Sequence, residues 1–276
     1  MCKTAPLLLA LMTALLGACA VSPTGRQQLM LVSDADLARQ GALAFEQTKR
    51  KTPVEREPGV NAYVRCVADA ILAQTGTPPA SWEVVVFHDD DANAFALPGR
   101  KIGVNSGLLR VARTPDQLAA VIGHEIGHVL AQHANERLSQ QVAVQGGLGV
   151  AGALAGDGAA LDLLGLGAQV GVLLPYSRLH ESEADRIGLD LMARAGFDPR
   201  QSIELWRNMA QEGGARPPEF LSTHPAPSSR LQELEAQMGA AMAAYQSAQV
   251  RGLRPACGQG LGYPAARGPL SPGALF

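Results

Sequence analysis

The chain has 276 residues, of which 25 are acidic and 23 are basic, so its formal net charge is −2 at pH 7. This near balance gives no support to nucleic-acid binding, which a strongly basic surface would favour. The length is sufficient for one large domain, or for one domain with appendages, and for a sizeable core.

The first residues have the composition of an export signal: Lys3, an apolar run over residues 6–16, and small residues before Cys19. This pattern resembles the bacterial lipoprotein signal, which implies that residues 1–18 are removed and that Cys19 is lipidated. A transmembrane helix is the alternative, but the apolar run is short for a bilayer. Ala20 follows the cysteine and, by resemblance to known sorting rules, favours the outer membrane. We therefore expect a lipid-anchored protein of the bacterial periplasm.

The first half of the remaining chain alternates helical and extended patterns. Cap residues and periodicity predict helices over residues 34–51 and 58–74, the second closed by a glycine. A β-branched and aromatic run predicts a strand over residues 81–88. Residues 95–97 and 101–105 are predicted to form a hairpin around a Pro-Gly turn.

The next predicted helix carries the most informative motif. Thr114 is an N-cap residue, Pro115 follows at the first helical position, and apolar residues at helical spacing extend the helix to about Gln140. His124 and His128 lie four residues apart, so they share a face of this helix and are suited to bind one zinc ion. Glu125 would then lie beside the metal, where it could take a proton from a water.

A zinc hydrolase needs a third protein ligand and an open fourth position. Ala134 stands six residues after the second histidine, which excludes a third histidine there, and His133 is interpreted as a surface residue. Glu181 is the other candidate, and Asp185 lies four residues later on the same face, where it could hold a ligand histidine. Glu183 points elsewhere and is the weaker ligand candidate. An ordinary acidic start of a helix is the alternative.

The second half of the chain is predicted to be helical over residues 177–195, 199–212 and 228–249. Residues 146–174 are rich in Gly, Ala and Leu and carry only two charged side chains. They fit either a pair of tightly packed helices or an apolar hairpin near the active site or the membrane. The composition does not decide between these arrangements.

Together these motifs resemble those of the gluzincin metalloproteases, the family of the CAAX prenyl endopeptidase, HtpX, BepA and LoiP. Besides the HExxH run and the Glu-x-Glu-Ala-Asp segment, the resemblance covers residues 24–33, 93–99 and 222–231, in the family's order. The match runs from about residue 19 to residue 246. The chain has no internal repeat, and this layout is closer to the LoiP type than to BepA, which carries a repeat domain.

The resemblance implies one zinc ion per chain, bound by His124, His128 and Glu181. It implies that Glu125 is the general base and that Asp185 supports the ligands. In BepA-like proteins a histidine corresponding to His224 can approach the metal and restrain activity. Alternatively, His224 or Arg230 would stabilise the oxyanion of the tetrahedral intermediate, and the plainest interpretation of His224 is a loop residue.

The expected substrate-binding element is an edge strand that pairs with an extended peptide backbone, formed by Asn93, Ala94, Phe95 and Ala96. An ordinary hairpin strand is the alternative. The resemblance implies a zinc-dependent endopeptidase of the cell envelope that cleaves extended or misfolded outer-membrane proteins in quality control. Unfolded or stalled outer-membrane proteins would be its partners, together with the envelope assembly machinery.

Two other functions fit the same motifs. A chaperone-like assembly factor would bind outer-membrane clients without depending on cleavage, although it has no need of Glu125 as a base. A structural zinc lipoprotein would need a closed fourth coordination position, and we see no fourth Cys or His near the motifs.

The expected fold is α+β and mainly helical, a zincin-like metalloprotease with a small sheet or hairpin beside the HExxH helix. The predicted parts are a removed signal, an N-terminal segment, the metalloprotease domain and a Pro/Gly-rich tail, at residues 1–18, 19–45, 46–250 and 251–276. Cys66 and Cys257 are an even pair in an oxidising compartment, so we expect a disulfide between them. Two unrelated buried thiols are the alternative.

Overall fold

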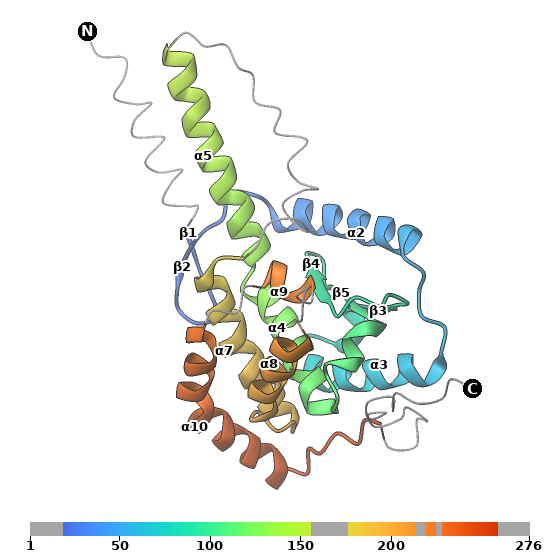
Figure 1. Cartoon of the computed structure of the whole chain (residues 1–276). Coiled ribbons are helices and arrows are strands. Elements are labelled where there is room, and N and C mark those ends of the chain that lie inside the picture. Colours follow the sequence, from blue (N-terminus) through green and yellow to red (C-terminus); the bar gives the residue numbers. More distant parts are fainter. Residues whose placement is uncertain (1–18, 156–175, 213–218, 225–227, 259–276) are drawn as a thin grey trace.

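The computed structural model describes residues 19–155, 176–212, 219–224 and 228–258, shown in Figure 1. The export signal predicted at residues 1–18 lies outside these ranges. So does most of the Gly/Ala/Leu-rich segment, of which the described part ends at Ala155.

Helices packed around a small sheet form the body of the protein. The helices are α2 (Asp34–Lys51), α3 (Pro58–Leu72), α4 (Pro115–Leu130), α5 (His133–Ala155), α7 (Arg178–Ala195), α8 (Gln201–Glu212), α9 (Glu219–Thr223) and α10 (Ser228–Val250). The strands are β1 (Cys19–Val21), β2 (Gln27–Leu29), β3 (Glu83–Phe87), β4 (Ala94–Leu97) and β5 (Lys101–Asn105). The predicted α+β, mainly helical class is therefore confirmed, and the strand ranges agree with the predicted strand and hairpin.

The three-stranded sheet has the order β3-β5-β4, so β4 is an edge strand. β3 runs parallel to β5, and β4 pairs with β5 in the antiparallel direction with Ala94 opposite Val104. Gly99 makes the β4–β5 turn with a φ of 82°, a conformation that favours glycine. Figure 1 shows α2 crossing above this sheet and α4 in the centre of the body.

Helix α4 packs very closely on α7, and glycines make this approach possible. A Cβ atom at Gly127 would lie 2.8 Å from the carbonyl oxygen of Ala184, and one at Gly188 would lie 2.6 Å from the backbone nitrogen of His124. The backbones therefore meet at a distance that larger residues would prevent. This contact brings the start of α7 against the HExxH residues of α4.

The prediction that the HExxH helix continues to Gln140 is wrong. Helix α4 ends at Leu130, Gln132 adopts a left-handed φ of 52°, and α5 starts at His133 in a new direction. Contacts from distant parts of the chain hold this turn: Gln28 donates to the Ala131 carbonyl at 2.7 Å, and Gln132 donates to Asp34 at 3.0 Å. Local helix propensity is overridden by these tertiary bonds.

The other predicted helices occur where the sequence placed them. Ser33 and Thr114 cap α2 and α4 through their side chains, and Gly196 ends α7 with a φ of 92°. At the C-terminal end of the described chain, the Sγ atoms of Cys66 in α3 and Cys257 form a disulfide. The domain boundaries proposed from the sequence stay a prediction.

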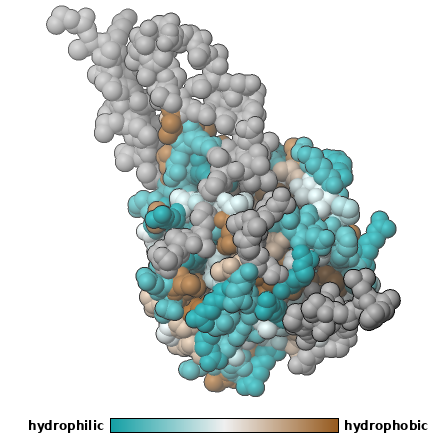
Figure 2. All heavy atoms as spheres, viewed as in Figure 1, coloured by the Kyte–Doolittle hydropathy of each residue, from teal (hydrophilic) through white to brown (hydrophobic). Residues whose placement is uncertain are grey.

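Most apolar side chains lie in one core between α3, α4, α7 and the sheet. On the face shown in Figure 2, hydrophilic residues cover most of the coloured surface, and hydrophobic residues appear in separate patches. Among the helices that the structure describes, none is both long and apolar enough to cross a bilayer.

Candidate metal centre

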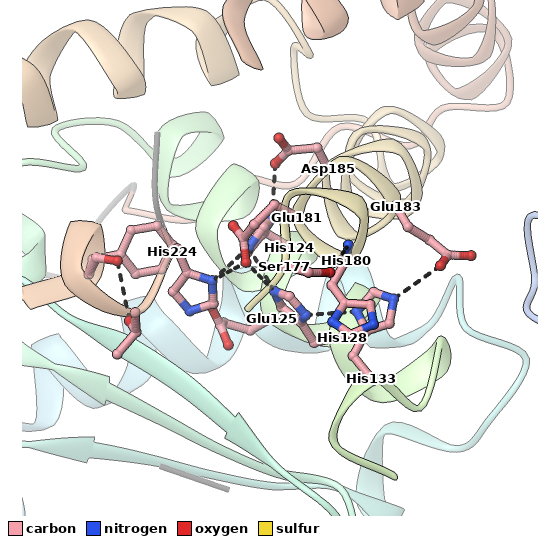
Figure 3. A network of polar contacts seen from close by, with 12 residues as sticks. His124, Glu125, His128, His133, Ser177, His180, Glu181, Glu183, Asp185 and His224 are labelled. Atoms are coloured by element: carbon pink, nitrogen blue, oxygen red, sulfur yellow. Dashed lines mark hydrogen bonds and ion pairs between the residues drawn. The ribbon is translucent and has the colours of Figure 1, made fainter. Parts of the chain in front are cut away.

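Helices α4 and α7 bring the three predicted ligands together, as Figure 3 shows. The Nε2 atoms of His124 and His128 are 3.0 Å apart, and the Glu181 oxygens lie 3.5 and 3.4 Å from them. All three side chains are buried, and together with His224 they offer ligand atoms within 4.8 Å of one another. Two imidazole nitrogens and a carboxylate oxygen that face one point are a donor set that zinc prefers, so the residues fit the ion.

Asp185, for which the sequence predicted a contact with a ligand histidine, lies behind His124. The Nδ1 atom of His124 and Asp185 Oδ1 are 2.9 Å apart. Arg230 donates from Nη2 to Asp185 Oδ1 at 2.7 Å and from Nη1 to Glu181 Oε2 at 2.7 Å. Burial raises the pKa of Asp185, but the charge of Arg230 and the bond to His124 outweigh it and hold the pKa below its ordinary value.

Arg230 is engaged by two carboxylates and by an aromatic ring. Its guanidinium lies 3.9 Å from the ring centroid of Trp206, in addition to its bonds with Asp185 and Glu181. These contacts favour a role in holding the ligands over the alternative role of Arg230 at an oxyanion.

Glu125 is 2% exposed, and its carboxylate accepts a hydrogen bond from the backbone of Ala96 in β4. Its Oε1 atom has no hydrogen-bond partner among the described residues, and His224 Nε2 lies 3.4 Å from it. Burial raises the pKa of this carboxyl. The residue is thus a buried carboxylate with a free oxygen beside the ligand cluster, as a proton acceptor would be.

His224 follows α9 and lies buried within the cluster. Its Nδ1 atom is 3.0 Å from Glu181 Oε1 and 3.2 Å from His124 Nε2. The rings of Phe220 and Tyr176 stack on it at 4.5 and 5.4 Å. The fold therefore places a fourth donor, the third imidazole nitrogen, beside His124, His128 and Glu181.

The interpretation of His133 as a surface residue is wrong. Its side chain is fully buried, with Nδ1 2.8 Å from His128 Nδ1 and Nε2 3.1 Å from Glu183 Oε2. The turn at Gln132 redirects the chain and carries the ring behind His128 instead of toward solvent. No pattern in the sequence indicates this turn, because its partners lie in the N-terminal segment.

Glu183 lies outside the group of converging donor atoms, and its side chain points away from that group in Figure 3. Burial raises its pKa, but hydrogen bonds from His133, Ser22, Thr24 and Arg26 outweigh this and hold the pKa well below its ordinary value. These partners, together with Tyr176, Glu136 and His180, were not identified from the sequence.

The predicted substrate strand is placed beside the cluster. Strand β4 is the sheet edge, and the buried Asn93 Oδ1 has no partner among the described residues. The Phe95 ring packs against Phe45 and Phe87, at centroid distances of 6.2 and 5.9 Å, and so its side chain is used in the core. A cavity of about 470 Å³ lies alongside, lined among others by Leu37, Trp82, Ala96, His128 and Tyr176.

The chain is similar to known metallopeptidases. The model of peptidase family M48 matches residues 58–238. The mitochondrial metalloendopeptidase OMA1 of Schizosaccharomyces pombe is 40% identical over 179 residues, which cover 63% of this chain and 51% of that protein. OMA1 of Saccharomyces cerevisiae is 38% identical, over 60% of this chain and 49% of that protein. The beta-barrel assembly-enhancing protease of Escherichia coli K12 is 29% identical over 203 residues, 69% of this chain and 41% of that protein. The chain spans about half the length of these relatives, or less.

Proposed function

The chain belongs to peptidase family M48, and from this premise we propose that it is a zinc-dependent endopeptidase of the bacterial cell envelope. We propose that it cleaves extended or misfolded outer-membrane proteins in quality control. The observation that carries the proposal is the position of Glu125 next to the His124, His128 and Glu181 donors. Its buried Oε1 atom has no hydrogen-bond partner in the part of the chain that the structure describes. A site that only binds zinc has no use for such a carboxylate.

In this mechanism the chain's own residues orient the reactants and move one proton. His124, His128 and Glu181 would hold the zinc ion, which would polarise the scissile carbonyl and acidify a water. Glu125 accepts the proton of the attacking water at its free oxygen and returns it to the nitrogen of the leaving amine. The closed packing of α4 on α7 keeps bulk water away from these donors.

The sheet edge supports an extended peptide as the substrate. A peptide that adds a strand beside β4 would present its backbone next to α4, and the adjoining cavity of about 470 Å³ would take its side chains. Only unfolded segments can pair in this way. We further propose that the clients are outer-membrane proteins and that the envelope assembly machinery is a partner, which the relatives named beta-barrel assembly-enhancing proteases support. The lipoprotein-like sequence at Cys19 supports a periplasmic location with a lipid anchor at the outer membrane.

One observation favours a second function, that of a chaperone-like assembly factor for outer-membrane proteins. His224 brings a fourth donor to the cluster, and a metal held by four protein donors has no open position for a carbonyl. In that state the protein would bind clients at β4 without cleaving them. Movement of His224 away from the metal would then open the fourth coordination position and allow cleavage of a bound client.

The test is metal analysis combined with casein cleavage by wild type, Glu125→Gln and His224→Ala. We expect Glu125→Gln to keep one zinc per chain and to lose cleavage, whereas unchanged proteolysis contradicts the mechanism. If Glu125→Gln fully rescues a deletion strain, the binding function dominates. More cleavage by His224→Ala identifies a restraining residue, and less cleavage identifies a residue that supports the transition state.

A further inference from the structure

Behind the ligand cluster, a chain of buried polar side chains leads from His128 to the N-terminal arm, by which we mean residues 19–29 with the hairpin β1–β2. We propose that His133, held by Glu183 and the N-terminal arm, is a positioning residue that fixes the ring and the tautomer of the zinc ligand His128. This inference rests on the zinc site of the proposed function but not on proteolysis.

The proton positions along this chain follow from the geometry. His128 turns Nε2 toward His124 and Glu181, and a nitrogen that binds a metal must offer a lone pair. The proton of a neutral His128 is therefore on Nδ1, which donates to His133 Nδ1 at 2.8 Å. His133 then carries its own proton on Nε2 and donates it to Glu183 Oε2 at 3.1 Å. In this single arrangement each ring nitrogen of His128 and His133 either donates or accepts a hydrogen bond or faces the metal position.

Glu183 ends the chain as a fully engaged carboxylate. Its Oε1 atom accepts hydrogen bonds from the hydroxyls of Ser22 and Thr24, and its Oε2 atom accepts from Arg26 Nε at 2.8 Å as well as from His133. Four donors leave the carboxylate no freedom to rotate. The orientation of the His133 ring is fixed as a consequence.

The N-terminal arm supplies these donors through strict alternation. Ser22, Thr24, Arg26 and Gln28 turn inward, whereas the residues between them are exposed. Arg26 also donates to the two oxygens of Glu136 at 2.6 and 2.5 Å, and Gln28 holds the Ala131 carbonyl at the end of α4. The arm is therefore part of the structure that orients the metal ligand. It is not a spacer between Cys19 and the enzyme.

Removal of His133 would leave the Nδ1 proton of His128 without an acceptor in a buried position. The ring would then be free to rotate or to change tautomer, and Nε2 would be available to zinc for part of the time only. Changes to groups that orient metal-binding histidines typically cost roughly 10- to 100-fold in metal affinity.

The experiment measures zinc affinity by competition with a chromophoric chelator and the visible spectrum of the cobalt-substituted full chain. His133→Phe keeps an aromatic ring but removes the acceptor, and we expect a loss of roughly 10- to 100-fold in zinc affinity with a changed cobalt spectrum. His133→Gln retains an acceptor and should recover most of the affinity. Ser139→Ala is the matched control, since it removes a buried hydrogen bond between α5 and Leu31 without touching this chain, and it should bind zinc like wild type.

A zinc affinity of His133→Phe within about twofold of wild type, with an unchanged cobalt spectrum, overturns the proposal. If His133→Phe does not fold, Arg26→Ala is measured in the same way: weaker zinc binding supports the proposal, and wild-type binding overturns it. Weaker binding by His133→Phe supports it even where the wild type cleaves no substrate. The absence of cleavage by the wild type would contradict only the proposed protease function.

Discussion

The two zinc-facing histidines of α4 are supported in different ways, although both supports end on α7. His124 bonds directly to Asp185, which is paired with Arg230 of α10. His128 reaches its carboxylate only through a second imidazole, and that carboxylate is paired with Arg26 of the N-terminal arm. Each histidine is therefore held by a carboxylate and an arginine, one from each end of the described chain.

The difference lies in where each support can be broken. The His124 side is short and almost fully excluded from solvent, since the Arg230 side chain is 3% exposed. The His128 side is longer, and its arginine is 18% exposed and follows closely on Cys19. A substitution on the His124 side should therefore lower the free energy of unfolding strongly. A substitution on the His128 side should lower it less and should mainly change the orientation of His128.

The largest effect is expected from Arg230→Met. This variant leaves the Asp185 and Glu181 carboxylates buried without their cation, and breaking a buried ion pair in this way costs about 3–5 kcal/mol. Urea unfolding of the metal-free protein measures the free energy of unfolding, with Arg230→Lys as the control that keeps the charge. A loss below about 1 kcal/mol would show that solvent reaches these carboxylates.

Asp185→Asn and Glu183→Gln compare the two supports at the level of zinc binding. Asp185→Asn removes the charge that bonds directly to His124, so we expect roughly a 100-fold loss of zinc affinity, near the upper end of such effects. Glu183→Gln acts through one further ring and keeps an acceptor for His133, so its loss should be close to tenfold. Chelator competition measures both values, and the reverse order would contradict the comparison.

The carboxylate on the His124 side was predictable, whereas its partner Arg230 and the whole His128 side were not, for a physical reason. His124, Glu125 and His128 share one helix, and Glu181 and Asp185 share another, so the 3.6-residue period gives their relative positions. The inward position of His133 depends on a turn at Gln132 that Gln28 and Asp34 stabilise from far away in the sequence. Periodicity contains no information about such contacts.

His224 shows an intermediate case. The Thr-His-Pro segment drew attention to this residue, but only the packing of α9 against α4 places its ring among the donors. Caps, turns and alternation predicted α2, α3, α7, α8, α10 and strands β3 to β5, but not β1, β2, α9 or the break between α4 and α5. What the sequence could not give was the close contact between α4 and α7, which depends on Gly127 and Gly188 meeting across the interface.

Arg26→Met should have a smaller effect on stability than Arg230→Met. It removes charge-assisted hydrogen bonds to Glu136 and Glu183, each of the kind that contributes about 1.5–3 kcal/mol when buried, but partial exposure reduces the loss to about 2 kcal/mol in total. Urea unfolding of the metal-free protein at neutral pH gives the value. A loss of unfolding free energy equal to that of Arg230→Met would mean that the His124 side and the His128 side contribute equally to the stability of the fold.

The smallest expected effect is the pH dependence of the difference in unfolding free energy between wild type and Arg26→Met. Burial raises the pKa of Glu136, but hydrogen bonds from Arg26 and Gln28 outweigh it and hold the pKa below its ordinary value. Below about pH 4.3, the ordinary pKa of glutamate, the unfolded chain takes up this proton before the folded chain does. The stability that the ion pair contributes is therefore present above that pH and is lost as the pH falls through the folded pKa.

The gap in unfolding free energy between wild type and Arg26→Met should consequently narrow between pH 6 and pH 3.5. Glu136 can contribute at most about 1 kcal/mol to this change, because pH 3.5 lies about 0.8 units below the ordinary pKa and each unit corresponds to about 1.4 kcal/mol. Burial lowers the pKa of His180 to about 4, so this residue also titrates in the window. It is present in both proteins, and the difference between them removes most of its contribution. A gap that stays constant over this range would mean that Arg26 stabilises the arm by packing alone, and that its charge plays no part in holding Glu136.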